Sequence, residues 1–223
     1  MSFSFIFFKH FSKLFFLLFS TIILAQNSFQ KGSYINQSGI KKEGYIYNSD
    51  WQNNPSSIEF KASLEKSSEI ITLDNIQEFE LTGICKYVKF DGLIDNSSSK
   101  LDELDFNRNP NWKQSSVLLK VLIESDASLF YYLTNQLHRF FYSVASKNLK
   151  TQQLVYKEFY KDGSRTENGT NFEFRQQLVT NLVCDSLRRI SIGSLKYNKN
   201  DLVNYFSEYN TCKGVIPAFR PWS

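Results

Sequence analysis

Histidine is scarce in this sequence, and its scarcity excludes whole classes of active site. The 223 residues contain two histidines, His10 and His138, of which only His138 lies outside the N-terminal segment. A histidine-rich metal site therefore lacks ligands, and a Ser-His-Asp triad would have to use His138, although no serine stands in a nucleophile elbow. The chain also lacks CxxC, HExxH, GxSxG and GxGxxG patterns. We therefore expect no catalytic residue, no cofactor-binding residue and no metal ligand.

Acidic residues are absent from the first 25 positions. Residues 1–25 carry Lys9 and Lys13, followed by the 12-residue apolar run LFFLLFSTIILA that ends at Ala25. A basic start, a short apolar core and a small residue before a polar stretch are typical of a secretory signal peptide. We expect cleavage between Ala25 and Gln26, and the alternative is an uncleaved anchor. No later run approaches the roughly 20 apolar residues of a spanning helix, so no transmembrane helix is expected after cleavage.

A strong excess of one charge is also lacking. The chain has 26 Lys+Arg and 22 Asp+Glu, and removal of residues 1–25 takes away two lysines, which leaves a net charge of +2. Such a balance does not imply a polyanion-binding surface, so no nucleic-acid partner is expected. About 200 residues can bury one sizeable core. We expect a signal peptide at 1–25, a single exported β-rich domain with a helical C-terminal part at 26–214, and a flexible tail at 215–223.

Three cysteines, Cys85, Cys184 and Cys212, remain in the expected exported domain. An odd number allows at most one internal disulfide, and an oxidising compartment favours its formation. Cys184 and Cys212 each follow a predicted helix closely, so we favour this pair and expect Cys85 to be a buried thiol. Three unpaired cysteines remain the alternative, because the sequence does not determine connectivity.

Short extended segments dominate the first two thirds of the domain. β-branched and aromatic residues with period-two alternation, bounded by Gly, Asn and Pro, indicate strands. Gly39 and the sequence Thr134-Asn135-Gln136 mark two hairpin turns, while 92–112 and 161–170 are expected to be loops. The predicted strands are 32–36, 44–48, 58–62, 69–73, 76–81, 86–91, a strand from 116, 128–133, 137–144 and 154–160.

The periodicity changes in the last 50 residues. Phe174, Leu178 and Leu182 recur at helical spacing behind Thr170 or Asn171 as a cap. A second helix is predicted behind an Asn200 cap by Leu202, Tyr205, Phe206 and Tyr209. Strands followed by two helices indicate an α+β fold. We expect mainly an antiparallel β meander with two C-terminal amphipathic helices.

Several polar patterns were weighed as functional sites. Oxygen-bearing side chains of a Ca²⁺ site occur at Asp102, Asp105, Asn107 and Asn109, but the EF-hand spacing is missing and a solvated loop is favoured. The sequence NKND at 198–201 matches the guanine-reading motif of GTPases, yet no phosphate-binding loop accompanies it, so a helix-capping turn is favoured.

Strand carboxylates and aromatic residues leave two further alternatives open. A pair among the acidic residues would serve a hydrolase only at a suitable separation, which the sequence does not define. The acidic candidates are Glu78, Glu80, Asp91, Asp95, Glu124 and Asp126. A dense aromatic group forms either the core or a face for stacking sugars or peptides, with the core favoured. Its members are Phe130, Tyr131, Tyr132, Phe140, Phe141 and Tyr142. His138, beside Arg139, is expected to pack or to face solvent.

Six segments carry a resemblance to a family. They are KGSYI (31–35), WQNNPSSIEF (51–60), NWKQSSVLLKVLIES (111–125), SLFYYLTNQLHRFFYS (128–143), FRQQL (174–178) and YNTCKG (209–214). Together they resemble an uncharacterised family of exported Bacteroidota proteins, whose members often place this region between a signal peptide and an outer-membrane β-barrel. Some members carry the automatic label "tRNA modification GTPase". The chain ends at Ser223, where a barrel would begin, so we expect a barrel-less or truncated form. The resemblance transfers no functional residues.

These observations favour a non-enzymatic exported domain that binds an envelope partner. The expected location is the periplasm or the outer membrane, and the expected partner is an outer-membrane β-barrel or another envelope protein. A carboxylate-dependent envelope hydrolase is the alternative from another class. A tRNA modification GTPase is a third reading by family label only, because the chain has no phosphate-binding loop.

Overall fold

A computed structural model describes residues 28–134, 137–161, 163, 165–185, 187 and 192–219. The expected signal peptide at residues 1–25 and its cleavage between Ala25 and Gln26 lie outside these residues, as does the Asn135-Gln136 part of one predicted turn. Within the described ranges, no helix combines the length and the apolar character needed to cross a membrane.

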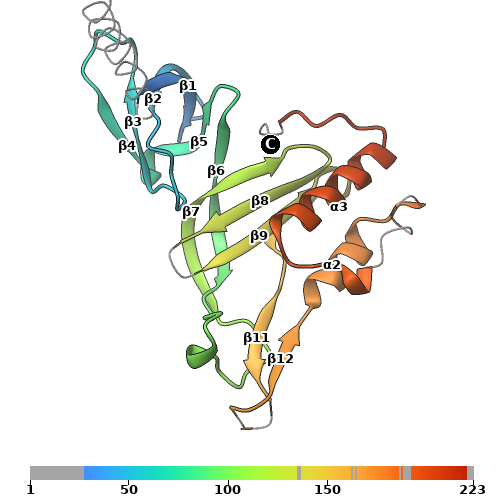
Figure 1. Ribbon diagram of the computed structural model, residues 1–223. Helices are drawn as coiled ribbons and strands as arrows, with labels where there is room; N and C mark the ends of the chain where they lie inside the picture. The colour runs from blue at the N-terminus through green and yellow to red at the C-terminus, as the bar shows by residue number, and fades with distance from the viewer. Residues whose placement is uncertain are drawn as a thin grey trace, which may run out of the picture.

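The fold is α+β and mostly antiparallel, as predicted. In the described part of the chain, ten strands form one sheet, two more form a small ribbon, and helices follow (Figure 1). The sheet contains β1 (Phe29–Asn36), β2 (Lys41–Tyr47), β3 (Ser57–Lys61), β4 (Glu69–Thr72), β5 (Ile76–Leu81), β6 (Cys85–Asp95), β7 (Trp112–Ile123), β8 (Ala127–Leu133), β9 (His138–Val144) and β10 (Leu149–Gln153). The ribbon is β11 (Lys157–Tyr160) with β12 (Asn168–Asn171), and the helices are α2 (Glu173–Asn181) and α3 (Lys199–Cys212).

The sheet departs from a simple meander between β4 and β5. Its order is β10-β9-β8-β7-β6-β5-β1-β2-β3-β4, so β4 and β5 are consecutive in the chain but four positions apart in the sheet. In a flat sheet four strand spacings span about 19 Å. The chain from Thr72 to Ile76 covers only four residues, which reach about 14 Å at most. The β1–β5 segment must therefore curl, and it encloses Tyr34, Ile46, Ile58, Phe60, Ile71, Ile76, Phe79 and Leu81.

The segment from β6 to β10 curls as well. These strands are also four spacings apart in the sheet order, yet the Gln153 side chain of β10 accepts a hydrogen bond from the Asp95 amide of β6 at 2.9 Å. The curl encloses a set of side chains that we call the inner cluster: Val88, Phe90, Ile94, Val117, Leu119, Val121, Phe130, Tyr132, Phe141 and Phe219. The opposite ends of this half-sheet thus come face to face.

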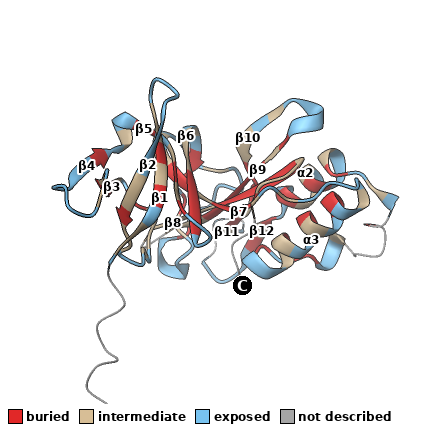
Figure 2. Ribbon diagram, turned by 90° about the horizontal axis from the view of Figure 1, so that it is seen from above, coloured by how far each residue is buried: buried red, intermediate tan, exposed pale blue. Residues whose placement is uncertain are grey.

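Helices α2 and α3 cover the outer face of β7, β8 and β9 (Figure 2). Phe174 and Leu178 of α2 and Leu202 and Phe206 of α3 are fully buried there. With helices on one side and the inner cluster on the other, the central strands are apolar on both faces. This explains why neighbouring residues are buried on both faces in the second half of β7 and in most of β9, and why β8 and β9 are rich in aromatic residues.

The predicted disulfide joins Cys184 to Cys212, and Cys85 is a buried free thiol. The bond links the chain just after α2 to the last residue of α3, with Cα atoms 6.5 Å apart. The alternative of three unpaired cysteines is therefore wrong. The two helices that cover the sheet are held together at their C-terminal ends.

Both predicted helix caps need correction. Asn198, not Asn200, caps α3, because its side-chain oxygen accepts a hydrogen bond from the Asp201 amide at 2.9 Å. The residue at the N-terminus of α2 is Phe172, which makes no side-chain cap. The Asn171 side chain, one residue earlier, accepts a hydrogen bond from the Glu173 amide at 3.0 Å.

The loop expected at 161–170 ends earlier, because β12 begins at Asn168 and pairs with β11. Two further predicted segment boundaries are also wrong. The loop expected at 92–112 is shorter, because β6 continues to Asp95 and pairs there with Trp112 at the start of β7. The strand expected at 154–160 is interrupted: β10 ends at Gln153, and β11 begins at Lys157 and pairs with β12 instead of the large sheet. Cross-strand pairing decided both boundaries.

The segment 215–223, expected to be a flexible tail, meets the sheet within its described part. The Ala218 amide donates to the Glu124 carbonyl at 2.7 Å, and the Glu124 amide donates to the Phe219 carbonyl at 3.0 Å. Phe219 also packs against the inner cluster. Residues 220–223 lie outside the described part of the chain.

Candidate functional site

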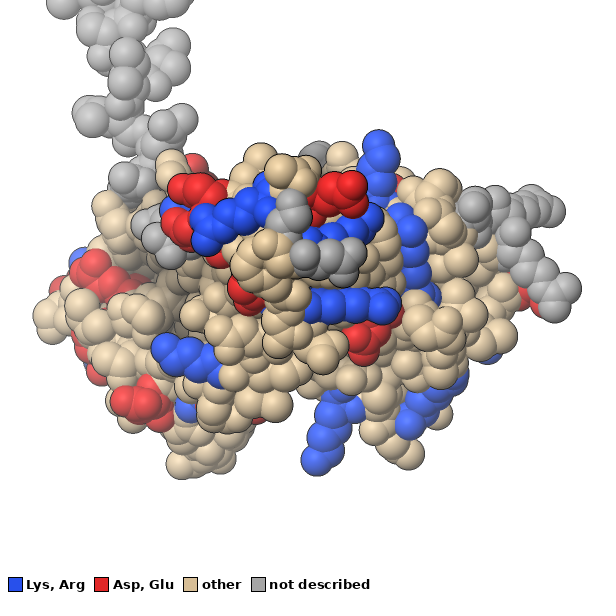
Figure 3. Space-filling model, turned by 90° about the horizontal axis from the view of Figure 1, so that it is seen from below, with Lys and Arg blue, Asp and Glu red and all other residues tan. Residues whose placement is uncertain are grey.

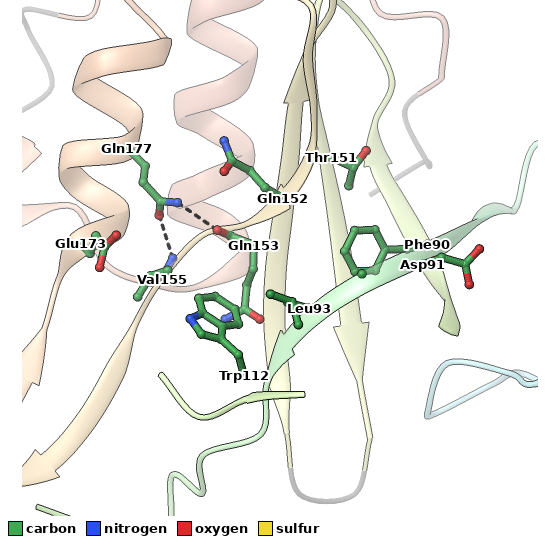
Figure 4. Close-up of a pocket in the computed structure, with 11 residues that line it drawn as sticks. Phe90, Asp91, Leu93, Trp112, Thr151, Gln152, Gln153, Val155, Glu173 and Gln177 are labelled. Atoms are coloured by element: carbon green, nitrogen blue, oxygen red, sulfur yellow. Dashed lines mark hydrogen bonds between the residues drawn. The ribbon is translucent and has the colours of Figure 1, made fainter. Parts of the chain in front are cut away.

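The candidate site is a pocket of about 350 Å³ between β6 and β10, which we call the β6–β10 pocket (Figure 4). Its volume falls within the range of small-ligand sites. The pocket exists because the curled half-sheet brings β6 and β10 face to face without pairing them. The residues that line it include Asp91, Leu93, Trp112, Gln153, Glu173 and Gln177.

One wall of the pocket is an unpaired edge of β6. The Asn96 amide donates to the Asn111 carbonyl at 2.8 Å, so alternate residues from Asn96 back along β6 direct their main-chain groups toward β7. Asp91 and Leu93 lie between those positions and direct their main-chain groups the other way. The pairing of β5 with β6 ends at Val88. Among the described residues, no strand therefore pairs with this edge at Asp91 and Leu93.

The other wall is the outer edge of β10. The Leu154 amide donates to the Phe140 carbonyl at 2.8 Å, so Gln153 turns its own main-chain groups away from β9. The Gln153 carbonyl accepts a hydrogen bond from Gln177 Nε2 at 3.0 Å, and the Val155 amide donates to Gln177 Oε1 at 2.8 Å. One side-chain amide of α2 thus bonds this edge as a peptide group of a neighbouring strand would (Figure 4).

The Gln153 side chain closes the narrow end of the pocket. Its Oε1 accepts the hydrogen bond from the Asp95 amide at 2.9 Å. Its Nε2 is buried and has no hydrogen-bond partner in the described part of the structure, while the residue is 4% exposed. A buried donor without an acceptor costs about 1–3 kcal/mol. The pocket therefore contains an unfulfilled hydrogen-bond donor at its base.

The mouth of the pocket is apolar. Trp112 is 42% exposed and Leu93 is 51% exposed, although both are large apolar residues. Trp112 is paired with Asp95, two residues after Leu93 on the same face of the sheet, so the two side chains are diagonal neighbours. Tryptophan is enriched among the residues that anchor protein partners, so Trp112 is the candidate anchor of this site. In Figure 4 the two side chains lie side by side over the lower end of the pocket.

A buried ion pair positions this end of the sheet. Arg139 of β9 is 2% exposed, and its Nη2 donates to Asp95 Oδ2 at 3.2 Å and to the Ser97 carbonyl at 2.6 Å. Asp95 is fully buried, and its Oδ1 also accepts hydrogen bonds from Ser97 and from the Asn111 amide. The pair joins β6 to β9 and holds the residue before Trp112. Asp95, weighed as a hydrolase carboxylate, is therefore engaged in a structural contact.

The loop that resembled a Ca²⁺ site contains an internal cation. The Lys157 side chain is 2% exposed, and its Nζ contacts both carboxylate oxygens of Asp105 at 2.9 and 3.0 Å and the Asn109 carbonyl at 2.8 Å. The Asn107 amide bonds Asp105, and the Asn107 side chain accepts from the Asn109 amide. An ammonium group of β11 thus binds the Asp105 carboxylate and the Asn109 carbonyl, and the contact fastens the loop to the ribbon.

Two of the acidic candidates, Glu78 and Glu124, are brought together by Lys86. The Lys86 Nζ lies 3.1 Å from Glu78 Oε1 and 2.9 Å from Glu124 Oε1. Burial lowers the pKa of Lys86, but the hydrogen bonds to Glu124 and Glu78 outweigh it, so the pKa is raised. The ammonium stays charged between the two carboxylates. Glu80 stands opposite Lys86 in the β5–β6 register.

The other two acidic candidates do not form a catalytic pair either. Asp126 accepts hydrogen bonds from the Ser146 amide at 2.7 Å and from its hydroxyl at 2.9 Å. Asp91 lines the β6–β10 pocket together with Glu173 of α2, but Figure 4 shows their carboxylates at opposite ends, separated by Leu93, Trp112 and Gln153. This arrangement lacks the facing carboxylates of a glycosidase-type hydrolase.

His138 and the NKND segment both have structural surroundings. His138 is half-buried beside the rings of Tyr197 and Phe140, at 6.2 and 6.4 Å. Burial, and next the charge of Arg139, lowers the pKa of His138. The segment 198–201 forms the capped start of α3, and the Asp201 carboxylate accepts a hydrogen bond from the Lys196 amide at 3.1 Å.

The aromatic group of β8 and β9 is mainly core. Phe130, Phe140, Phe141 and Tyr142 are buried, while Tyr131 and Tyr132 are partly buried. The exposed aromatic residue of the site is Trp112 instead, which the sequence analysis did not single out, together with Gln153 and Gln177. No sequence period identified them, because they meet only when β6, β10 and α2 are placed together.

Comparison with protein-family models, with curated proteins and with solved structures finds no match.

Proposed function

We propose that this protein is a non-enzymatic, exported binding domain that holds an envelope partner in the β6–β10 pocket. The observation that carries the proposal is the pocket between β6 and β10, with the unpaired edge of β6 along one wall and Trp112 and Leu93 exposed at its mouth. Asp95 pairs with Arg139, and Asp126 accepts a hydrogen bond from Ser146. The Lys86 ammonium lies between Glu78 and Glu124. These contacts also favour binding over hydrolysis. The Cys184–Cys212 disulfide is compatible with an oxidising compartment.

The proposed location is the periplasm or the periplasmic side of the outer membrane. The signal-peptide pattern supports export, and the resemblance to barrel-linked proteins supports an outer-membrane protein as the partner. In the view of Figure 3 basic and acidic side chains are interspersed on the surface. A mixed surface of this kind favours recognition by shape and hydrogen bonding over attraction to one strong charge.

Site-specific photo-cross-linking in the native envelope tests the proposal. A photoreactive phenylalanine analogue replaces Trp112 in one variant and Ile70 in a control variant. Ile70 is 67% exposed on β4 and lies at the opposite edge of the sheet. We expect a discrete envelope-protein adduct from position 112 and none from position 70. Equal adducts from both positions, none from position 112, or a cytosolic location of the protein would refute the proposed function.

A further inference from the structure

We propose that the ligand of the β6–β10 pocket is an extended segment of the partner protein, which adds as a β-strand to the free edge of β6 at Asp91 and Leu93. This inference rests on the proposed function and specifies the chemistry of the ligand. Strand addition to an exposed sheet edge is an established mode of peptide recognition, in which main-chain hydrogen bonds provide affinity and alternate side chains provide specificity. In this protein the free edge of β6 lines such a pocket, opposite β10.

The two edges match a strand in direction. Four antiparallel steps separate β6 from β10, so these two strands run parallel to one another. An added strand that runs opposite to β6 therefore forms an antiparallel pair with it, the more common type of pairing, and also runs antiparallel to β10. On the β6 side, Asp91 and Leu93 offer unpaired main-chain groups at alternate positions, which is the spacing that an antiparallel partner requires.

Side-chain amides already take the place of such a strand at the narrow end. Gln177 bonds the Gln153 carbonyl and the Val155 amide, and Gln153 bonds the Asp95 amide. Both are primary amides, with the same donor and acceptor groups as a peptide bond. The open part of the pocket thus begins beyond the side-chain amides of Gln153 and Gln177. The Nε2 of Gln153 beside them is buried and has no partner in the described part of the structure.

The walls also define which side chains fit. On the inner side, Gly92 has no side chain and the ring of Phe90 lies against it, since a Cβ built at Gly92 would meet Phe90 Cζ at 2.5 Å. On the outer side, Leu93 and Trp112 provide an apolar contact. Because side chains of a strand alternate between the two faces, the occupant needs an apolar residue toward Trp112 and residues toward Phe90 small enough for the inner wall. An alternating peptide meets this requirement.

A matched pair of substitutions isolates the main-chain contribution. Leu93→Pro removes the N–H that faces the pocket, whereas Leu93→Val keeps it, and both retain an apolar side chain. Proline is tolerated where the N–H of a strand does not bond a neighbour. With the photoreactive residue at position 112, we expect Leu93→Pro to lower the adduct yield about tenfold, equivalent to about 1.4 kcal/mol of binding free energy. Leu93→Val should keep most of the yield.

The cross-linking outcomes separate the two proposals. No adduct from position 112 in the parent chain overturns the proposed function. A clear adduct of equal yield in Leu93→Pro and Leu93→Val overturns strand addition and leaves the proposed function standing. Thermal unfolding of both variants shows whether Leu93→Pro is folded.

A measurement on the unsubstituted chain keeps the test decisive if Leu93→Pro does not fold. The probe is the capped hexapeptide Thr-Val-Thr-Val-Thr-Val at millimolar concentration, with an analogue N-methylated at alternate residues as its control. We expect the hexapeptide to slow hydrogen exchange at the Asp91 and Leu93 amides about tenfold, and the N-methylated analogue to have no effect. No slowing, or equal slowing by both peptides, overturns strand addition. An N-acetylglucosamine oligomer that shifts the Trp112 indole signal without slowing these amides would instead assign the pocket to a glycan.

Discussion

The buried Asp95–Arg139 pair gives the sharpest stability prediction. Replacing Asp95 by Asn keeps the size of the side chain and leaves an oxygen for the Ser97 and Asn111 donors. It removes the only carboxylate paired with Arg139 among the described residues, and the guanidinium is 2% exposed. Arginine does not lose its proton in proteins, so the charge stays buried.

The expected cost of Asp95→Asn is about 3–5 kcal/mol, the range for removing one partner of a buried ion pair. This is a large share of a typical unfolding free energy of about 5–15 kcal/mol. Arg139→Met should also be strongly destabilising, because it leaves a fully buried carboxylate without its cation. The double variant should cost about 1–3 kcal/mol less than the sum of the single variants, because neither charge remains.

Urea unfolding at pH 7, followed by circular dichroism with the disulfide intact, measures these free energies. Asp74→Asn is the matched control, since Asp74 is exposed, and its effect should stay within about 0.5 kcal/mol. An Asp95→Asn cost below about 1 kcal/mol, or additivity of the single variants within about 0.5 kcal/mol, would refute the structural role given to this pair.

Three further predictions concern the cysteines and His138. Replacing both Cys184 and Cys212 by Ser should lower stability by about 3.5 kcal/mol in the chain-entropy model and the melting temperature by about 7–14 °C, and an unchanged calorimetric midpoint would contradict this. Burial raises the pKa of Cys85 to about 11, so maleimide at pH 8 should label it only in denaturant, and rapid labelling of the folded chain would show the thiol to be accessible. The lowered pKa of His138 means that the unfolded chain binds a proton more readily than the folded chain. Stability should therefore fall as the pH falls below about 6.5, and His138→Gln should reduce this slope in urea titrations; an equal slope in both chains counts against it.

Local features of the fold were predictable from the sequence. The hairpin at Gly39 is present because Gly39 adopts a positive φ of 77° in the turn between β1 and β2. The change from period two to helical spacing located α2 and α3, since Phe174, Leu178, Leu202 and Phe206 are the residues that these helices bury. These features depend on residues close together in the chain, so propensity and spacing describe them well.

The errors occurred where a distant segment decided the structure. The loop expected at 92–112 is shorter than predicted, because Asp95 of β6 pairs with Trp112 of β7. The strand at 154–160 was divided because β10 pairs with β9 while β11 pairs with β12. The acidic loop around Asp105 resembled an ion site in sequence, but its cation is Lys157, 52 positions away.

The candidate site shows the same limit most clearly. The sequence favours a core role for the aromatic residues of β8 and β9 and leaves a stacking face as the alternative, and their rings are largely enclosed between the helices and the inner cluster. Trp112 stands at the end of a strand, where no periodicity distinguishes an exposed residue from a buried one. Gln153 and Gln177 are ordinary polar residues until their amides meet main-chain groups of the sheet.

The sequence by itself determined the α+β class and the two helices, because these follow from composition and short-range spacing. It also narrowed the cysteines to a favoured pair, which the structure contains. Only the tertiary structure decided that the sheet curls, that Asp95 meets a side chain 58 positions away, and that a pocket opens between β6 and β10. The physical reason is that strand twist and curl accumulate over many cross-strand contacts, and no local pattern specifies which distant edges come face to face.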